Sequence, residues 1–303
     1  MHAAAHRKDL ASATDQAPST TQAICCQLHK RNEEATLWLL LDSLFEEAAM
    51  HTCSFRTTLV LLALSLLAGC VPRADTTRPI PLALIAAPQT AHRLVVILPG
   101  RADDLAALKK SGVAQAIQDI WPDADVQLAE LRMADYRQGQ AIARLHEEVI
   151  APARKRGYAQ IWLGGASLGG MGTLLYDTQY PGEMDGLLLF APYLGERAIL
   201  DEIAAAGGVA QWNPGPPQPL GPDTWQHELW RHIKTLSNDP ARMRHVWLAY
   251  GAQDSLRDAI ALMVPLLPRD HVLVRPGGHR WSVWTPAMRE LLQAASHEAA
   301  QLP

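Results

Sequence analysis

The sequence contains no cysteine after Cys70, although it is 303 residues long. Its four cysteines are Cys25, Cys26, Cys53 and Cys70. The body of the chain therefore has neither a disulfide framework nor a cysteine metal site. It also lacks the HExxH motif of zinc peptidases and the G-x-x-x-x-G-K phosphate loop, so neither a metal nor an organic cofactor is expected.

Positive charge is not in excess either. The 27 Lys and Arg residues stand against 31 Asp and Glu residues, which leaves a net charge of −4. Such a chain has no basic field to attract a phosphate backbone, so nucleic acid is not an expected partner. The hydrophobic content of 48% can fill a substantial core, which excludes a disordered or collagen-like chain.

The apolar run over residues 57–69 extends for about a dozen residues, fewer than the ~20 that a membrane-spanning helix needs. Arg56 precedes it, and the small residues Ala68 and Gly69 end it. This layout is typical of an export signal. The tetrapeptide Leu-Ala-Gly-Cys that ends at Cys70 resembles the lipobox of bacterial lipoproteins. The resemblance implies that Cys70 is acylated after cleavage and that the protein is lipid-anchored in the cell envelope, on the periplasmic or outer-surface face.

An export signal belongs at the N-terminus, and Met50 supplies a start at the right distance. We therefore expect residues 50–69 to be the signal peptide and residues 1–49 to be an upstream extension that is not native. The alternative is a genuine extension, because residues 33–50 have the apolar spacing of an amphipathic helix. Residues 70–90, with four prolines, predict an extended tether, although residues 80–86 could instead be a first edge strand.

After residue 91, continuous apolar runs alternate with stretches that have helical spacing. The runs 94–98, 126–131, 161–163, 187–190, 246–250 and 272–274 predict buried strands. Helices are expected over 105–120, 139–156, 168–180 and 285–300. This alternation predicts an α/β domain over residues 91–303, with a mostly parallel sheet covered by helices on both faces.

Residues 194–244 interrupt the alternation with three tryptophans, Trp212, Trp225 and Trp230, and with five prolines over residues 214–222. An insertion of this kind between strands predicts a small lid over a site at the carboxyl ends of the strands. The alternative is a surface excursion whose tryptophans only pack it down.

The sequence Gly165-Ala-Ser167-Leu-Gly169 directly follows the apolar strand 161–163 and directly precedes a predicted helix. A sharp strand-to-helix turn at this place would expose the hydroxyl of Ser167 in strained dihedral angles, and the close backbone would require glycine on both sides. An ordinary glycine-rich turn is the alternative.

A serine hydroxyl needs a base to become a nucleophile, and the base needs an acid to orient it. Asp254 follows the fifth predicted strand, and His279 lies in a glycine-rich loop after the sixth. Both positions are at the same sheet edge as Ser167. Asp258 and Asp270 are rival acids, but Asp258 lies four residues into a further expected helix, and Asp270 is at the wrong end of the sixth predicted strand.

These residues and their order resemble those of the α/β-hydrolases over roughly residues 92–300. The resemblance implies an oxyanion hole of two backbone amides, one from Leu168 and one from the loop after the first central strand. In that loop, Arg101 is the favoured donor and Gly100 the second, because Pro99 replaces a histidine that many relatives have. Arg101, Asp103 and Asp104 could brace the loop by ion pairing, or the two acids could simply begin a helix.

The resemblance implies a serine hydrolase that cleaves carboxylic esters, with thioesters as related substrates, through an acyl-enzyme and without a cofactor. The tryptophan-rich insertion favours a small-molecule ester with an apolar acyl or alkyl group. The lipid anchor makes the membrane a second partner. Two alternatives stay open: an acyltransferase with the same triad, and a non-catalytic binding protein with this fold.

Overall fold

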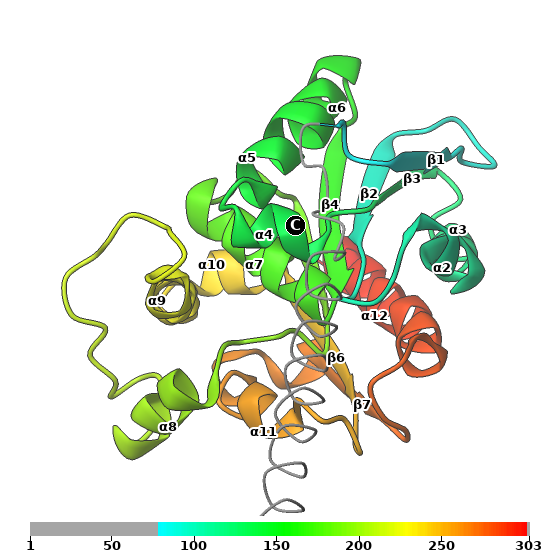
Figure 1. Cartoon of the computed structure of the whole chain (residues 1–303). Coiled ribbons are helices and arrows are strands. Elements are labelled where there is room, and N and C mark those ends of the chain that lie inside the picture. Colours follow the sequence, from blue (N-terminus) through cyan, green and yellow to red (C-terminus); the bar gives the residue numbers. More distant parts are fainter. Residues whose placement is uncertain (1–77, 302–303) are drawn as a thin grey trace, which may run out of the picture. The chain divides into compact units, whose positions relative to one another are not determined.

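The computed structural model of the chain describes residues 78–301 (Figure 1). Segments 1–49 and 50–69, Cys70 and the first part of the 70–90 tether lie outside the described residues, so their interpretations stay predictions. Within residues 78–301, no helix combines the length and apolar character that crossing a bilayer requires.

Seven strands of the described residues form one sheet, in the order β1-β3-β2-β4-β5-β6-β7. Neighbouring strands are parallel, except that β1 runs antiparallel to β3 at one edge. The six apolar runs become the six parallel strands, and β1 is the edge strand that was the alternative to a tether. The strands are β1 (Leu82–Ile85), β2 (Arg93–Leu98), β3 (Ala124–Ala129), β4 (Gln160–Ala166), β5 (Gly186–Phe190), β6 (Val246–Gly251) and β7 (Val272–Arg275).

Helices cover both faces of the sheet (Figure 1). One face is covered by α2 (Leu105–Lys110), α3 (Val113–Gln118) and α12 (Trp281–Gln301). The other is covered by α7 (Leu168–Gln179), on which the helix α5 (Ala141–Leu145) and the insertion helix α9 (Trp225–Ser237) pack. Short helices complete the domain: α4 (Met133–Arg137), α6 (Ala151–Arg156), α8 (Arg197–Ala205), α10 (Pro240–Met243) and α11 (Arg257–Ile260).

Three helix boundaries differ from the prediction. The helix expected over 105–120 is divided into α2 and α3 because Gly112, at φ 75°, turns the chain between them. The helix expected over 139–156 begins at Ala141 and contains a π-helical turn, His146–Ile150. The last helix begins at Trp281 rather than at residue 285, so Pro286 lies inside it.

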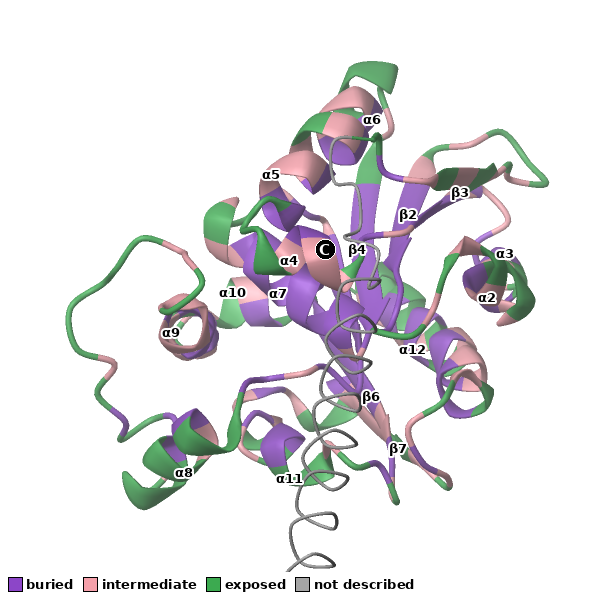
Figure 2. Ribbon diagram, viewed as in Figure 1, coloured by how far each residue is buried: buried purple, intermediate pink, exposed green. Residues whose placement is uncertain are grey.

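The core follows the central strands (Figure 2). All five residues of β5 are buried, as are five of the six in β2. Both faces of these strands are covered by helices, which explains why their sequences are continuously apolar instead of alternating.

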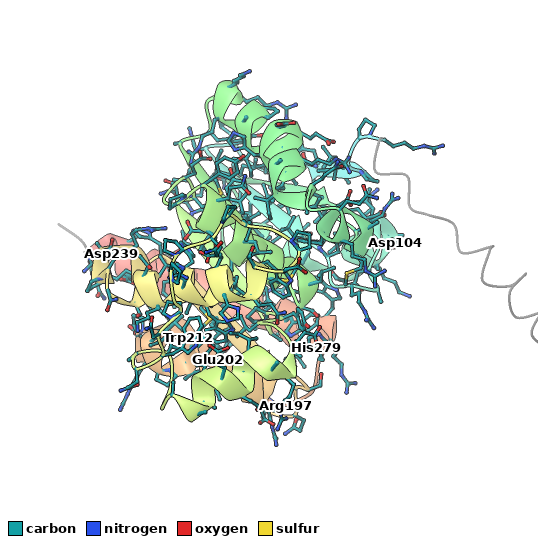
Figure 3. The ribbon with its side chains drawn as sticks, turned by 60° about the vertical axis from the view of Figure 1, so that its left-hand side comes forward. Asp104, Arg197, Glu202, Trp212, Asp239 and His279 are labelled. Atoms are coloured by element: carbon teal, nitrogen blue, oxygen red, sulfur yellow. The ribbon has the colours of Figure 1, made fainter. Side chains whose placement is uncertain are left out.

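The insertion 194–244 contains α8, α9 and α10, and two of its tryptophans are buried. Trp212 donates its indole N–H to Glu202 Oε1 at 2.7 Å, and Figure 3 shows the two side chains together between α8 and α9. Trp230 donates to the Leu194 carbonyl at 2.7 Å. These two rings therefore hold the insertion in place, and the lid stays a prediction.

Candidate active site

Ser167 is the single residue between the end of β4 and the start of α7, and its backbone is strained. Its φ of 54° and ψ of −111° lie in a region that residues with a Cβ seldom occupy. Backbone contacts hold it there: its N–H donates to the Phe190 carbonyl at 2.8 Å, and its own carbonyl accepts from Tyr193 N at 2.9 Å and Met171 N at 3.1 Å. The turn thus has the geometry expected of a nucleophile elbow.

The glycines on either side of Ser167 are required by close backbone packing. A Cβ on Gly165 would lie 2.3 Å from the carbonyl carbon of Gly169. A Cβ on Gly169 would lie 2.5 Å from the carbonyl oxygen of Leu98, at the end of β2. These approaches let the first turn of α7 lie directly against the loop that follows β2.

Asp254 and His279 meet at the carboxyl ends of β6 and β7. His279 Nδ1 lies 2.9 Å from Oδ1 and 3.0 Å from Oδ2 of Asp254. The Asp254 carboxylate is fully buried and also accepts a hydrogen bond from Leu256 N at 2.9 Å, whereas 27% of the His279 side chain is exposed. A buried carboxylate on Nδ1 fixes the tautomer in which Nδ1 carries the proton, so Nε2 is left as the basic nitrogen.

The rival acids are elsewhere. The Asp258 side chain is 92% exposed and pairs with Arg257 at 3.3 Å. Asp270 is also exposed, in the turn that precedes β7. Of the three candidate acids, only Asp254 contacts His279.

The acid loop and the histidine loop are bonded to each other. Gln253 N donates to the Gly277 carbonyl at 2.9 Å, and Gly277 N donates to Gln253 Oε1 at 2.6 Å. The contact is so close that a Cβ on Gly251 would lie 2.2 Å from the Gly277 oxygen. The distance between Asp254 and His279 is therefore set by the backbone beside them.

The structure brings Asp254 and His279 into contact and puts Ser167 at the same sheet edge, but it does not join all three. Within residues 78–301, the Ser167 hydroxyl and His279 Nε2 have no hydrogen-bond partner. Hydrogen bonds between a nucleophile and its base are often long without substrate and tighten in the complex.

In the loop after β2, the two candidate oxyanion donors, the amides of Gly100 and Arg101, differ in whether they already have a partner. Gly100 N already donates to Asp103 Oδ2 at 3.1 Å, and the Gly100 carbonyl accepts from Asp103 N at 3.1 Å. Arg101 is at the exposed tip of this turn. Leu168 is the first residue of α7, where a backbone N–H has no carbonyl partner within its own helix.

The acids of this loop do not pair with Arg101. Asp104 caps α2 by accepting from Ala107 N at 2.7 Å, as the helix-start alternative expected. Asp103 accepts from Gly100 N and, at 2.9 Å, from the indole N–H of Trp281. Sequence analysis did not find Trp281. Its only signal was its position, two residues after His279.

Tyr193 is a further residue that the sequence did not reveal. Its N–H donates to the Ser167 carbonyl, and its hydroxyl donates to Glu196 Oε1 at 2.6 Å. Burial, the hydrogen bond to Glu196 and the Glu196 charge raise the pKa of Tyr193 above its usual value, against the opposing charge of Arg101. The phenol is therefore held protonated against Glu196, while the Tyr193 backbone supports the elbow.

Three other histidines of the described residues have partners away from Ser167, Asp254 and His279. His146 bonds the Tyr176 hydroxyl, His232 bonds Asp177, and His271 bonds Glu298. The described residues contain no group of three or more His, Cys, Asp or Glu side chains that could hold a metal ion.

The fold is that of the α/β-hydrolases, as predicted. No family model and no curated protein matches the sequence. Among solved structures, the chain is similar to fluorophosphonate-binding serine hydrolase F of Staphylococcus aureus, at 12% identity and a TM-score of 0.50, over 71% of this chain and 98% of that one. An S-formylglutathione hydrolase of the same organism is 14% identical, with a TM-score of 0.49, over 71% and 89%. Est1E from Butyrivibrio proteoclasticus is 15% identical, with a TM-score of 0.49, over 72% and 95%.

Proposed function

We propose that this protein is a serine hydrolase that cleaves small carboxylic esters, and related thioesters, through an acyl-enzyme. Ser167 is the nucleophile, His279 the base and Asp254 the acid that orients it. The observation that carries this proposal is the buried Asp254 carboxylate on Nδ1 of His279, at the sheet edge where Ser167 is held at positive φ.

In the first step, the Ser167 oxygen attacks the carbonyl carbon while His279 Nε2 takes the hydroxyl proton. The tetrahedral oxyanion then collapses, the alcohol leaves with the proton from Nε2, and the acyl group stays on Ser167. Water then attacks the acyl-enzyme while His279 takes a proton from the water. The carboxylic acid product is released, and Ser167 regains its hydrogen from His279. Throughout, Asp254 keeps the imidazole oriented and stabilises its charged form.

The oxyanion is stabilised by the amides of Leu168 and Arg101 in this proposal. Gly100 is the weaker candidate because its N–H is already donated to Asp103. The amide of Arg101, at the tip of the same turn, is favoured. Two preorganised donors of this kind are each worth about 10²–10³-fold in kcat.

A panel of p-nitrophenyl esters of increasing acyl length tests the proposal, together with labelling by a fluorophosphonate probe. We expect wild-type protein to be labelled and to hydrolyse short or medium esters, and Ser167→Ala to lose both properties. A wild type that is not labelled and is no faster than Ser167→Ala would leave the non-catalytic binding protein as the better interpretation. Transfer of the acyl group to added alcohols in preference to water would favour the acyltransferase.

We further propose that the enzyme is tethered to a membrane of the bacterial cell envelope by a lipid on Cys70. Support comes from the Leu-Ala-Gly-Cys sequence after the apolar segment 57–69. Expression in bacteria fed with labelled palmitate should label the wild type and not Cys70→Ala, and the intact mass of the product should correspond to a chain that begins at Cys70.

A further inference from the structure

One carboxylate oxygen bridges two loops of the candidate site. Asp103 Oδ2 accepts from Gly100 N at 3.1 Å and from Trp281 Nε1 at 2.9 Å. Gly100 belongs to the loop after β2, and Trp281 is the first residue of α12, two positions after His279. Although 178 residues separate the two bonded side chains, they connect the loop of Arg101 with the loop of His279.

On the β2 side, the bridge fixes the turn that presents Arg101. The turn is closed twice, because Gly100 and Asp103 also bond through the Asp103 N–H and the Gly100 carbonyl. A Cβ on Gly100 would lie 2.9 Å from Asp103 Oδ2, so a side chain at this position would displace the bridging carboxylate. Arg101 is thereby held at a defined place beside the end of β2.

On the α12 side, the bridge continues to His279 through two rings. The Trp281 ring contacts that of Trp284 edge to face, with centroids 5.4 Å apart and an interplanar angle of 83°. Trp284, which is buried, contacts His279 in the same way at 4.7 Å and 87°. His279 is therefore held by Asp254 at Nδ1 and by the Trp284 ring, which Trp281 contacts in turn.

We propose that Asp103 and Trp281 are positioning residues that keep the Arg101 amide and the His279 imidazole at a fixed separation. The inference rests on the proposed function, since these are the groups that would stabilise the oxyanion and move the proton. Donors in an oxyanion hole act only within a narrow distance of the developing charge, and a displacement of about 1 Å can cost about 10²-fold in rate. Asp103 itself acts by fixing the positions of these groups, because a negative charge beside an oxyanion would repel it and not stabilise it.

The sharpest variant is Trp281→Phe, which removes the indole N–H and keeps an aromatic ring. We expect kcat toward a p-nitrophenyl ester to fall roughly tenfold while KM changes little, because the lost interaction matters in the transition state. Asp103→Ala, which opens both bonds, should lower kcat about 10²-fold. Asp103→Asn, which keeps an acceptor oxygen, should recover much of that loss. The double variant Asp103→Ala/Trp281→Phe should be no worse than Asp103→Ala, since both changes break the same bridge.

The matched control is Trp121→Phe. Trp121 also donates its indole N–H to α12, to Ser296 Oγ at 2.7 Å, but it does so just before β3, away from the strand ends that carry the triad. The same chemical change there should leave kcat unchanged even where it lowers the melting temperature.

Hydrogen exchange gives a readout that needs no activity. Peptides that cover residues 100–104 and 277–283 should exchange faster in Trp281→Phe and Asp103→Ala than in wild type or Trp121→Phe. Unchanged exchange, a kcat within twofold of wild type for Trp281→Phe, or a loss confined to KM would overturn the positioning role alone, provided that the wild type reacts with the fluorophosphonate probe. An unlabelled wild type would overturn the proposed hydrolysis and this role with it.

Discussion

Gly169→Ala is the substitution for which the structure gives the clearest expected magnitude. The new methyl group would lie 2.5 Å from the Leu98 oxygen and 2.7 Å from both the Leu98 carbonyl carbon and the Pro99 oxygen. Ordinary van der Waals contact begins at 3.4 Å, so the closest contact is about 0.9 Å too short. All three atoms are backbone, and no side-chain rotation can relieve the overlap. Helix α7 and the loop after β2 must therefore move apart.

The stability cost follows from overpacking. Extra methyl groups in packed sites cost about 1–3 kcal/mol, and alanine returns at most about 1 kcal/mol through its better helix propensity. We expect a net loss of about 1–2 kcal/mol and a melting temperature lower by about 2–8 °C. The activity cost should be larger. The two proposed oxyanion donors, Leu168 and Arg101, are on the two segments that separate, so kcat/KM should fall about 10²-fold.

Thermal unfolding and ester hydrolysis measured on the same preparations test both numbers. Gly221→Ala is the control, since its methyl group would make only ordinary contacts, with Thr224 Oγ1 at 3.5 Å and the Pro219 oxygen at 4.0 Å. If Gly169→Ala kept a kcat/KM within threefold of the wild type while Gly221→Ala behaved normally, the close approach of α7 to the β2 loop would not set the geometry of the oxyanion hole.

Two further predictions concern buried acids. Asp254→Asn should lower kcat by about 10³–10⁴-fold with little effect on the circular dichroism spectrum, because an amide no longer fixes the His279 tautomer; Asp258→Asn, with its side chain 92% exposed, should match the wild type in the same ester assay. The second acid, Asp177, is bonded by His232 at 2.7 Å and Arg242 at 2.8 Å. Burial alone would raise the pKa of Asp177, but the hydrogen bond and charge of His232, followed by the Arg242 charge and Gly182 N, outweigh it and lower that pKa below 3.8. A depressed pKa in the folded state adds stability that is fully present above the unfolded value and is lost as the pH falls toward the folded value. Asp177→Asn should therefore lower the unfolding free energy at pH 7 by about 1.5–3 kcal/mol, the usual worth of hydrogen bonds to a charged group, in urea titrations. This difference from the wild type should shrink as the pH is lowered through 3.8 and below, and a pH-independent difference would contradict the assignment.

The parallel sheet could be predicted because its strands are covered on both faces, which leaves continuous apolar runs such as that of β5. The positions of Ser167, Asp254 and His279 followed from the same pattern, since each comes directly after a strand. Asp254, and not Asp258, contacts His279, and the local reason is its shorter distance from the end of β6. The local sequence pattern was therefore enough to predict a residue's position wherever that residue closely follows a strand.

The rest depended on contacts between distant segments. Asp103 was expected to act within its own loop, whereas its second partner is Trp281, and no local pattern could indicate a bond across 178 residues. For Trp212 and Trp230 the sequence left open a lid over a site or the packing of the insertion itself, and their indole N–H groups are bonded inside the insertion. A tryptophan in a proline-rich segment has the same appearance in sequence whether its ring faces a ligand or its own segment.

Backbone contacts connect the ends of the five strands around the candidate site, β2, β4, β5, β6 and β7. Ser167 N bonds the end of β5 at Phe190, Ala191 N bonds β6 at Ala249, and Ala252 N bonds β7 at Arg275. Gly169, which follows β4 in the chain, packs against the end of β2 and so connects these two strands. These links join neighbouring strands and follow from the sheet itself, so a variant that breaks them also damages the fold. The Asp103–Trp281 bond instead joins the loop after β2 to the start of α12, which follows β7. The strands β2 and β7 are not neighbours in the sheet. Among these links, only the Asp103–Trp281 bond can be removed while the sheet stays intact. Trp281→Phe can therefore test the positioning of the catalytic groups without damage to the fold, which a glycine substitution at the elbow cannot do.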